Sequence, residues 1–343
     1  MESGVAVRNY KSMYPADSAD QHSPAALPYP SGWFCVGFSK EWRPGDVRTR
    51  RFMGTDTVVY RTLSGALRAS QPYCPHLGAH LGAGGTVEGE LLVCPFHRFA
   101  FAPDGACART PYGKPPKLSL GLLPVCEKQG IVWLWHSPDG TPPAWRLPDF
   151  PASSTPSTFR AIDLAGQPQD VLENVVDYGH LRELHGLRFV DVVSEPKGDG
   201  PFYSIGLRIG RDLLRFPMDQ EVTCRFVGVG AAVLTIELAQ LRTRATAWVL
   251  ATPVAPARMR FWSAARVATD RVPRLPMPLQ RAFERALSVG MNWWTVHDIE
   301  VDLPIWHHKK YVRHPGLNDG DGPIGHFRHW ARQFYPQEIP ATS

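Results

Sequence analysis

The sequence predicts an α+β chain in which a small all-β domain precedes a second domain built from an antiparallel sheet with helices. The first part is predicted by short β-rich runs that alternate with Gly and Pro turns from Trp33 to about His136. The second part opens with a helical stretch, continues through strand-like segments of alternating polarity and closes with a long helical candidate. At 343 residues the chain is long enough for two domains with separate cores.

The first half divides into an arm and a domain. Residues 1–30 show no sustained apolar period and are interrupted by Pro and Ser, so we expect a mobile N-terminal arm. Residues 31–145 are expected to form the all-β domain, with strands at the β-rich runs 57–61 and 130–135. A Pro-rich link follows these strands.

Residues 146–343 are expected to form the second domain. A helical stretch is predicted around 167–187, and a long helix is predicted over 278–303, ending at Pro304. Between them, alternation of apolar and polar residues predicts an antiparallel sheet with one buried face. Its predicted strands are Tyr203–Ile209, Glu221–Val227, Val233–Leu238, Ala245–Ala251 and Met259–Val267.

Two short loops of the first domain carry pairs of metal-binding side chains. Cys74 and His76 are separated by one residue, and seventeen residues later Cys94 and His97 are separated by two. With both thiolates on one iron and both imidazoles on the other, these residues can hold a [2Fe-2S] cluster. Two histidine ligands raise the reduction potential above that of an all-cysteine ferredoxin, so the spacing predicts a site that transfers single electrons.

Zinc is the alternative metal for four Cys and His ligands. Cys2His2 fingers place both cysteines first and both histidines about a dozen residues later, whereas here each cysteine is followed closely by its own histidine. The surroundings also suit a cluster, because Pro75 and Pro95 stiffen the loops and several glycines free backbone amides to approach sulfur. His80 lies in the first loop, but its spacing does not make it a ligand.

The composition is typical of an intracellular metalloprotein, and we expect a cytoplasmic location. Of six cysteines, two are assigned to the cluster and the other four lack the spacing of a disulfide framework. We expect no membrane span and no signal peptide. The formal net charge of +5 comes without the dense basic run of a nucleic-acid binder, although a basic patch would suit an acidic electron donor.

A second candidate site lies on the first predicted helix of the second domain, where His180 and His185 are separated by four residues. Both can face one pocket if the helix ends or loosens between them, which nearby glycines allow. Two histidines and one carboxylate form the facial triad of non-haem iron(II) oxygenases. The carboxylate candidates near the end of the long helix are Asp298, Glu300 and Asp302. Spacing does not choose between the two aspartates, because residues four apart share a helical face.

Over nearly its whole length the chain resembles the Rieske-type non-haem iron oxygenases, most closely the branch of the ketosteroid 9α-hydroxylase oxygenase component and the cholesterol 7-desaturases. The loops that begin at Cys74 and Cys94 match the Rieske loops of that branch. The stretch Glu173-Asn-x-x-Asp-x-x-His-x-x-x-x-His matches its catalytic motif. In that branch the carboxylate ligand precedes an Ile-Trp pair, and Asp302-Leu-Pro-Ile-Trp fits, so the resemblance selects Asp302.

The resemblance also implies a fold, cofactors and partners. The first domain would be a Rieske domain, and the second a helix-grip domain whose sheet and helices enclose an apolar pocket. The implied cofactors are a [2Fe-2S] Rieske cluster, a mononuclear Fe(II), O2 and, indirectly through a reductase, NAD(P)H. A ferredoxin, a flavin reductase or both would deliver the electrons. A head-to-tail homotrimer is implied, in which the cluster of one subunit serves the iron of its neighbour.

The same resemblance implies roles for residues beside the metals. Asp177 would hydrogen bond a Rieske histidine across the subunit interface and an iron-binding histidine, His180, in its own subunit. Asn174 would lie near the iron as a hydrogen-bond donor, and Glu173 would support the helix. The chain departs from the family where Arg98-Phe99 replaces the usual Gly-Trp, which alters the edge of the cluster.

The implied function is that of an oxygenase component that hydroxylates or desaturates a bulky hydrophobic, sterol-like or steroid-like molecule. Oxidative tailoring, or O- or N-demethylation, of another hydrophobic natural product is the alternative. An interpretation of a different class is a Rieske electron carrier whose second domain binds a partner. The set of His180, His185 and Asp302 argues against a carrier, because a carrier has no need of an oxygen-activating iron.

Overall fold

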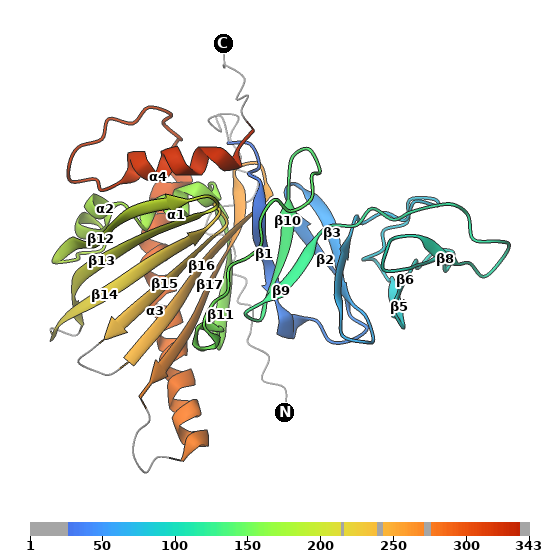
Figure 1. The fold of residues 1–343 in the computed structure, drawn as a ribbon, viewed down its shortest axis with the longest axis horizontal. Helices are drawn as coiled ribbons and strands as arrows, with labels where there is room; N and C mark the ends of the chain where they lie inside the picture. Colours follow the sequence, from blue (N-terminus) through green and yellow to red (C-terminus); the bar gives the residue numbers. More distant parts are fainter. Residues whose placement is uncertain (1–26, 214–215, 239–242, 271–275, 337–343) are drawn as a thin grey trace. The chain divides into compact units, whose positions relative to one another are not determined.

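The computed structural model describes residues 27–213, 216–238, 243–270 and 276–336. The chain divides into two compact units, Trp33–Arg146 and a second unit of Leu147–Ser343 together with the residues up to Gly32 (Figure 1). The first unit is all β, and the second is a large antiparallel sheet with helices, so the predicted α+β architecture is confirmed. The predicted arm, residues 1–30, lies outside the described residues as far as residue 26.

The first unit consists of three small antiparallel sheets. One has the order β1-β10-β9, and its two longer strands have almost continuously apolar sequences that are buried on both faces. The other two have the orders β2-β3-β4 and β5-β6-β7-β8. The strands are β1 (Gly32–Phe38), β2 (Val47–Phe52), β3 (Thr55–Arg61), β4 (Leu67–Ser70), β5 (Thr86–Glu88), β6 (Leu91–Val93), β7 (Ala100–Phe101), β8 (Cys107–Arg109), β9 (Val125–Lys128) and β10 (Ile131–His136).

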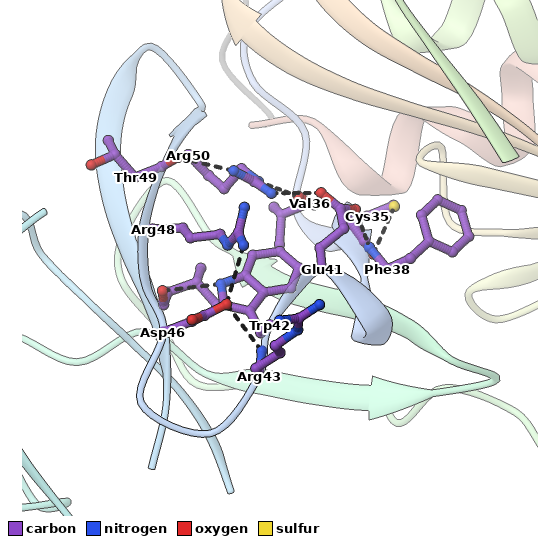
Figure 2. Close-up of polar contacts among 12 residues, drawn as sticks. Cys35, Val36, Phe38, Glu41, Trp42, Arg43, Asp46, Arg48, Thr49 and Arg50 are labelled. Carbon is purple, nitrogen blue, oxygen red and sulfur yellow. Dashed lines mark hydrogen bonds and ion pairs between the residues drawn. The ribbon is translucent and has the colours of Figure 1, made fainter. Parts of the chain in front are cut away.

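A polar cluster ties β1 to β2 (Figure 2). The guanidinium of Arg50 on β2 donates to Val36 O of β1 at 3.0 Å and pairs with Glu41 at 2.7 Å. The same guanidinium lies over the ring of Trp42, 4.6 Å from its centroid. The indole N–H of Trp42 donates to Val59 O of β3 at 3.1 Å. These contacts connect the sheet that contains β1 with the sheet β2-β3-β4.

The second unit is built on a seven-stranded antiparallel sheet of order β11-β17-β16-β15-β14-β13-β12. All five predicted strands are present, and two further strands, β11 and β12, were not predicted. These two form the edges of the sheet, and β12 is largely exposed and interrupted by register shifts, so it lacks the apolar alternation of a half-buried strand. The strands are β11 (Thr158–Ala165), β12 (Phe189–Asp199), β13 (Phe202–Leu213), β14 (Phe216–Val227), β15 (Ala231–Leu238), β16 (Thr243–Ala255) and β17 (Arg258–Thr269).

Four α-helices accompany this sheet: α1 (Pro168–Asn174), α2 (Tyr178–Glu183), α3 (Met277–His308) and α4 (Ile324–Ala331) (Figure 1). The single helix predicted around 167–187 is therefore two short helices. The prediction that the long helix ends at Pro304 is wrong, because α3 continues through the proline to His308. Among the described helices, none combines the length and the apolarity needed to cross a membrane.

The helix α3 is fastened to the sheet by buried polar side chains. The backbone N–H of Val267 on β17 donates to the Ser288 hydroxyl at 2.9 Å, and the Ser263 hydroxyl of the same strand bonds the Asn292 side chain. Both helix residues are fully buried. These bonds fix the rotation of α3 along β17, and thereby determine which of its carboxylates face inward.

Candidate functional site

The four predicted cluster ligands lie on two loops of the first unit, one between β4 and β5 and the other between β6 and β7. The loops have the same backbone pattern. Cys74 N donates to Ala79 O, and Gly78 N donates to Cys74 O, at 2.8 and 2.9 Å. In the second loop Cys94 N and O make the equivalent bonds, with Phe99 O and Arg98 N, at 2.8 and 3.2 Å. The sequence folds this way because each loop turns back directly after its cysteine and histidine.

The equivalent residues Gly78 and Arg98 both have left-handed backbone, with φ of 75° and 59°. Glycine adopts this conformation without strain, whereas a side chain at such a φ is strained. Arg98 nevertheless has the same left-handed backbone as Gly78, so the loop keeps its shape with some backbone strain, and the exposed guanidinium adds a cation beside the histidines. Its guanidinium pairs with Glu88, which also pairs with Arg109.

The four side chains suit a [2Fe-2S] cluster. The thiols of Cys74 and Cys94 are buried and lie within hydrogen-bonding reach of each other. The rings of His76 and His97 are 4.9 Å apart and more exposed than the thiols. Two neighbouring thiols beneath two neighbouring imidazoles form the donor set in which each iron receives a pair of like ligands.

Backbone amides close to the Cys74 sulfur can stabilise a thiolate ligand. Burial raises the pKa of Cys74 to about 11, although the backbone amides of His76 and Leu77 donate to its sulfur and lower the pKa. A coordinating metal deprotonates a thiol outright, and amides that point at sulfur stabilise the thiolate formed. Phe99, in place of the family's tryptophan, stacks on the His76 ring at 4.2 Å with the two planes 8° apart.

The cysteines outside the loops and the remaining histidine of the first loop have other environments. Cys35, Cys107, Cys126 and Cys224 form no disulfide bond within the described residues. The Nδ1 atom of His80 accepts a hydrogen bond from Gly82 N at 3.1 Å, and its ring lies edge-on to Tyr73. This histidine therefore helps to shape its own loop.

The second site begins at the end of α2. After this helix, Gly186 N donates to Arg182 O at 3.1 Å and Leu187 N donates to Leu181 O at 3.2 Å. The bond from Gly186 N to Arg182 O is that of the αL C-cap motif, and its left-handed residue is Gly186, with φ of 65°. The tight turn directs His185 back towards His180, as predicted from the glycine. Their rings are 4.5 Å apart and nearly perpendicular.

Three ligand atoms converge at this place. His180 Nε2 is 3.0 Å from Asp302 Oδ1 and 2.8 Å from His185 Nε2, and His185 Nε2 is 3.4 Å from Asp302 Oδ1. Neighbouring ligands bound at about 2.1 Å from one metal ion are about 3 Å apart when they meet it at right angles. Three atoms at this spacing could form one face of a coordination sphere and would leave other positions open to further ligands.

The structure distinguishes the three carboxylate candidates. Asp302 is buried beside the histidines, whereas Asp298, one turn earlier, makes two 2.8 Å hydrogen bonds with Arg211 of β13. Glu300 lies near His297 at the surface. Burial by itself would raise the pKa of Asp302, but hydrogen bonds and charge from His180 and His185 outweigh burial and lower this pKa. The carboxylate is therefore kept ionised, the form that binds metal.

Asp177 caps the helix that carries the first histidine. Its Oδ1 accepts a hydrogen bond from the backbone N–H of His180 at 2.9 Å, the usual contact of an N-cap residue. The predicted bond from Asp177 to the ring of His180 is absent, since Nδ1 of this ring has no hydrogen-bond partner among the described residues. Asp177 Oδ1 instead accepts the bond from the backbone amide. The loop before α4 supports α2 from outside, since Tyr178 N donates to Asp321 O at 3.2 Å.

Two of the residues predicted to accompany the site lie on α1. Asn174 does not direct its amide nitrogen at the three ligand atoms; in the orientation that pairs both its polar atoms, this nitrogen donates to Asp170 O at 3.1 Å. Glu173 supports the helices by a buried ion pair with Arg328 of α4. Sequence reasoning missed Arg328 and Arg211 as partners, because each is an isolated arginine whose carboxylate is distant in the sequence.

Models of two protein families match this chain. The model described as the Rieske [2Fe-2S] domain matches residues 32–127. The model described as the 3-ketosteroid 9alpha-hydroxylase C-terminal domain matches residues 134–335, more than half of the chain. The two matches correspond to the parts that hold the four cluster residues and the His-His-Asp group.

Similar proteins include members of two groups. The cholesterol 7-desaturase of Bombyx mori is 29% identical over 90% of this chain and 70% of its own length. The probable 3-ketosteroid-9-alpha-monooxygenase oxygenase component of Rhodococcus rhodochrous is 25% identical over 90% of this chain and 80% of its own length. Among solved structures, apo dicamba monooxygenase superposes with a TM-score of 0.64 at 19% identity, covering 90% of this chain and 98% of that one. This last similarity establishes the fold.

Proposed function

Since this chain belongs to the Rieske non-haem iron oxygenases, in the branch of the 3-ketosteroid 9α-hydroxylases and the cholesterol 7-desaturases, we propose that it hydroxylates or desaturates a bulky hydrophobic molecule of the sterol or steroid class. It acts as the oxygenase component of a multiprotein enzyme. The observation that carries the proposal is the convergence of His180, His185 and Asp302 in a chain that also has a Rieske domain. An electron carrier would have no use for such a group.

The proposed roles follow from the donor atoms. Cys74 and Cys94 bind one iron of the [2Fe-2S] cluster, and the two loop histidines bind the other. His180, His185 and Asp302 bind the mononuclear iron. When bound, the cluster supplies electrons one at a time and the mononuclear iron supplies open positions for O2. The buried Asp302 carboxylate would contribute the negative charge that offsets the metal, and each imidazole would offer a nitrogen lone pair.

The helix side of the sheet favours an apolar substrate. Tyr203 of β13 contacts Phe327 of α4, which identifies the strand face that looks towards the helices. Residues paired across neighbouring strands lie on the same face, so the strand register identifies the other residues of this face from β13 to β16. Most of its members beyond Tyr203 are apolar, and they become small on β16: Ile205, Leu207, Val222, Phe226, Leu234, Ile236, Ala245 and Ala247. Gln220, opposite Ile209, is a polar member of the same face. The names of the two relatives, a cholesterol desaturase and a 3-ketosteroid monooxygenase, point to the same class of molecule.

We expect a homotrimer arranged head to tail, in which the cluster of one subunit serves the iron of the next. The proposal is supported by Asp177, whose carboxylate has one oxygen bound to His180 N and a second oxygen available to a partner. A Rieske histidine of the neighbouring subunit is the expected partner. Electrons would then pass from cluster to iron by way of this carboxylate and the helix that it caps.

A Rieske oxygenase depends on an electron donor, and the charge of this chain suggests an acidic ferredoxin or flavin reductase that draws on NAD(P)H. The net charge of +5 resides wholly in residues 33–146, where thirteen Lys and Arg outnumber eight Asp and Glu. Arg98 and Arg109 lie on either side of Glu88 at the edge of the cluster loops and are half exposed. Surface cations next to a redox site speed the approach of an acidic partner.

Replacing Arg98 by glycine is expected to raise the KM for the electron donor by up to about fivefold, since one exposed charge contributes at most about 1 kcal/mol. Glycine suits the left-handed backbone at this position, so the loop should not unfold. Turnover of enzyme reduced chemically with dithionite should be unchanged. Arg48 of β2 provides the control, because it is similarly exposed and also pairs with a carboxylate, that of Asp46 (Figure 2). Its replacement by alanine should leave the KM for the electron donor unaltered. Equal effects of the two variants would exclude a donor site at Arg98.

The proposed function is tested by metal content and by products. The purified chain should contain about three irons and show a Rieske-type EPR signal after reduction. Reduced enzyme exposed to O2 with cholesterol, a 3-ketosteroid or an aromatic ether should then yield a product visible by mass spectrometry. Addition of oxygen or loss of a hydrogen pair from a sterol or steroid supports the proposal. Demethylation of the ether alone would move the assignment to the tailoring alternative, and zinc in place of iron would overturn both.

A further inference from the structure

Polar side chains of α1 hold the part of the chain that follows Asp302. The Glu173 carboxylate accepts two hydrogen bonds from the guanidinium of Arg328 on α4, at 2.6 and 2.7 Å. Asp170, one turn earlier on α1, lies 3.3 Å from the ammonium of Lys309, the residue directly after α3. All three α1 and α4 side chains are largely buried, so each ion pair is shielded from competing water.

A third contact joins α1 to α3 itself. In the amide orientation that pairs both polar atoms of Asn174, its nitrogen donates to Asp170 O at 3.1 Å and its oxygen accepts from the indole N–H of Trp306, also at 3.1 Å. Trp306 is buried, and it lies four residues after Asp302, so both side chains project from the same face of the helix. The indole and the carboxylate are therefore fixed together.

The helix α3 is weak at this place by itself. Pro304 lies between Asp302 and Trp306 inside the helix and has no N–H to donate to the carbonyl of Glu300. An interior proline removes one bond of the helical ladder and allows a kink. The last turn continues to His308 in spite of the proline, and the contacts of Trp306 and Lys309 with α1 explain why.

We propose that α1 is the positioning element of Asp302: through the hydrogen bond between Asn174 and Trp306 it fixes the last turns of α3 and thereby sets how tightly the mononuclear iron is held. Asn174 and Trp306 are positioning residues, because they act on the metal through Asp302. The inference rests on the proposed function, since it requires iron at His180, His185 and Asp302. Asn174 of the catalytic motif would thus act on Asp302 indirectly, through its hydrogen bond to Trp306.

The test is the variant Trp306→Phe, which removes the indole N–H and keeps an aromatic ring in the buried position. The iron-loaded protein is mixed with a ferrous chelator, and release of the mononuclear iron is followed while the EPR signal of the cluster is monitored. We expect iron release to be about 10-fold faster than in the parent, because groups that orient a metal ligand change metal affinity by about this much. The matched control is Trp293→Phe, on the exposed face of the same helix, which should release iron at the parental rate.

Further measurements separate positioning from general stability. The unfolding temperature of Trp306→Phe should remain close to that of the parent, and the cluster signal should be unchanged. Asn174→Ala should also speed iron release, and the double variant should be no faster than the single ones, since both remove the same bond. Release from Trp306→Phe at the parental rate would overturn the inference and leave the proposed function intact. A parent protein without the third iron would instead contradict the proposed function.

Discussion

Replacing Asp302 by alanine is expected to lower the iron content from about three to about two per chain and to abolish oxygenation. The physical reason is that Asp302 provides the only carboxylate among the three converging ligand atoms, and two neutral imidazoles alone bind a hard divalent ion weakly. The Rieske-type EPR signal should persist, because its ligands lie in the other unit. Iron analysis, EPR spectroscopy and product detection on one preparation check the three expectations.

The control for this variant is Asp298→Ala. Asp298 lies one turn earlier on α3 and is also a partly buried carboxylate, but it is hydrogen-bonded to Arg211. Its loss should cost stability, since it leaves a partly buried guanidinium without its partner, while the mononuclear iron stays bound. If Asp298→Ala lost the iron and Asp302→Ala kept it, the assignment of the third ligand would be wrong.

Replacing Asp177 by asparagine is expected to leave both metal sites filled and the cluster spectrum unchanged, yet to slow turnover by about 100-fold. Asparagine is as good an N-cap as aspartate, so its side-chain oxygen retains the bond from His180 N and the stability should change by less than about 0.5 kcal/mol. The substitution removes the negative charge, on which the bridge to a neighbouring Rieske histidine depends. Turnover under saturating substrate and donor measures the effect.

The variant Asp177→Ala distinguishes the bridge from the cap. Alanine removes both the charge and the capping oxygen, at a cost of about 1 kcal/mol of stability. If Asp177→Asn turned over normally and only Asp177→Ala were impaired, Asp177 would be a helix cap and nothing more. Equal loss of turnover in the two variants, with stability lost in only one of them, would support the bridge.

The local parts of the fold were predictable because their causes are local. Strand-like segments of alternating polarity predicted the five inner strands of the second unit, from β13 to β17. The expected single buried face is wrong for β16, which is buried on both faces along most of its length and has strands on both sides. The edge strand β12 was missed, since an exposed strand with register shifts has no buried face to generate a pattern. The end of α3 was misplaced at Pro304 for the opposite reason, because distant partners maintain a turn that the local sequence disfavours.

The cluster loops show how far local chemistry extends. The cysteines and histidines were recognisable from their spacing, and the structure adds that Gly78 and Arg98 occupy equivalent left-handed positions. That equivalence explains why the family has glycine after the second histidine and why Arg98 changes surface charge more than loop shape. The sequence shows only that Arg98 differs from the family's residue, whereas the backbone shows that the difference affects surface charge.

By itself, the sequence determined which side chains are the candidate metal ligands and how they pair, since ligand type and short spacing are properties of a few neighbouring residues. Spacing left Asp298 and Asp302 as alternatives and the family resemblance selected Asp302, but only the tertiary structure shows why this carboxylate joins the two histidines. His180 and Asp302 are 122 residues apart, and Asp302 faces inward because α3 is fastened to β17 and to α1, while Arg211 occupies Asp298. Contacts of this range depend on how the chain returns through the sheet, and no local period encodes that path.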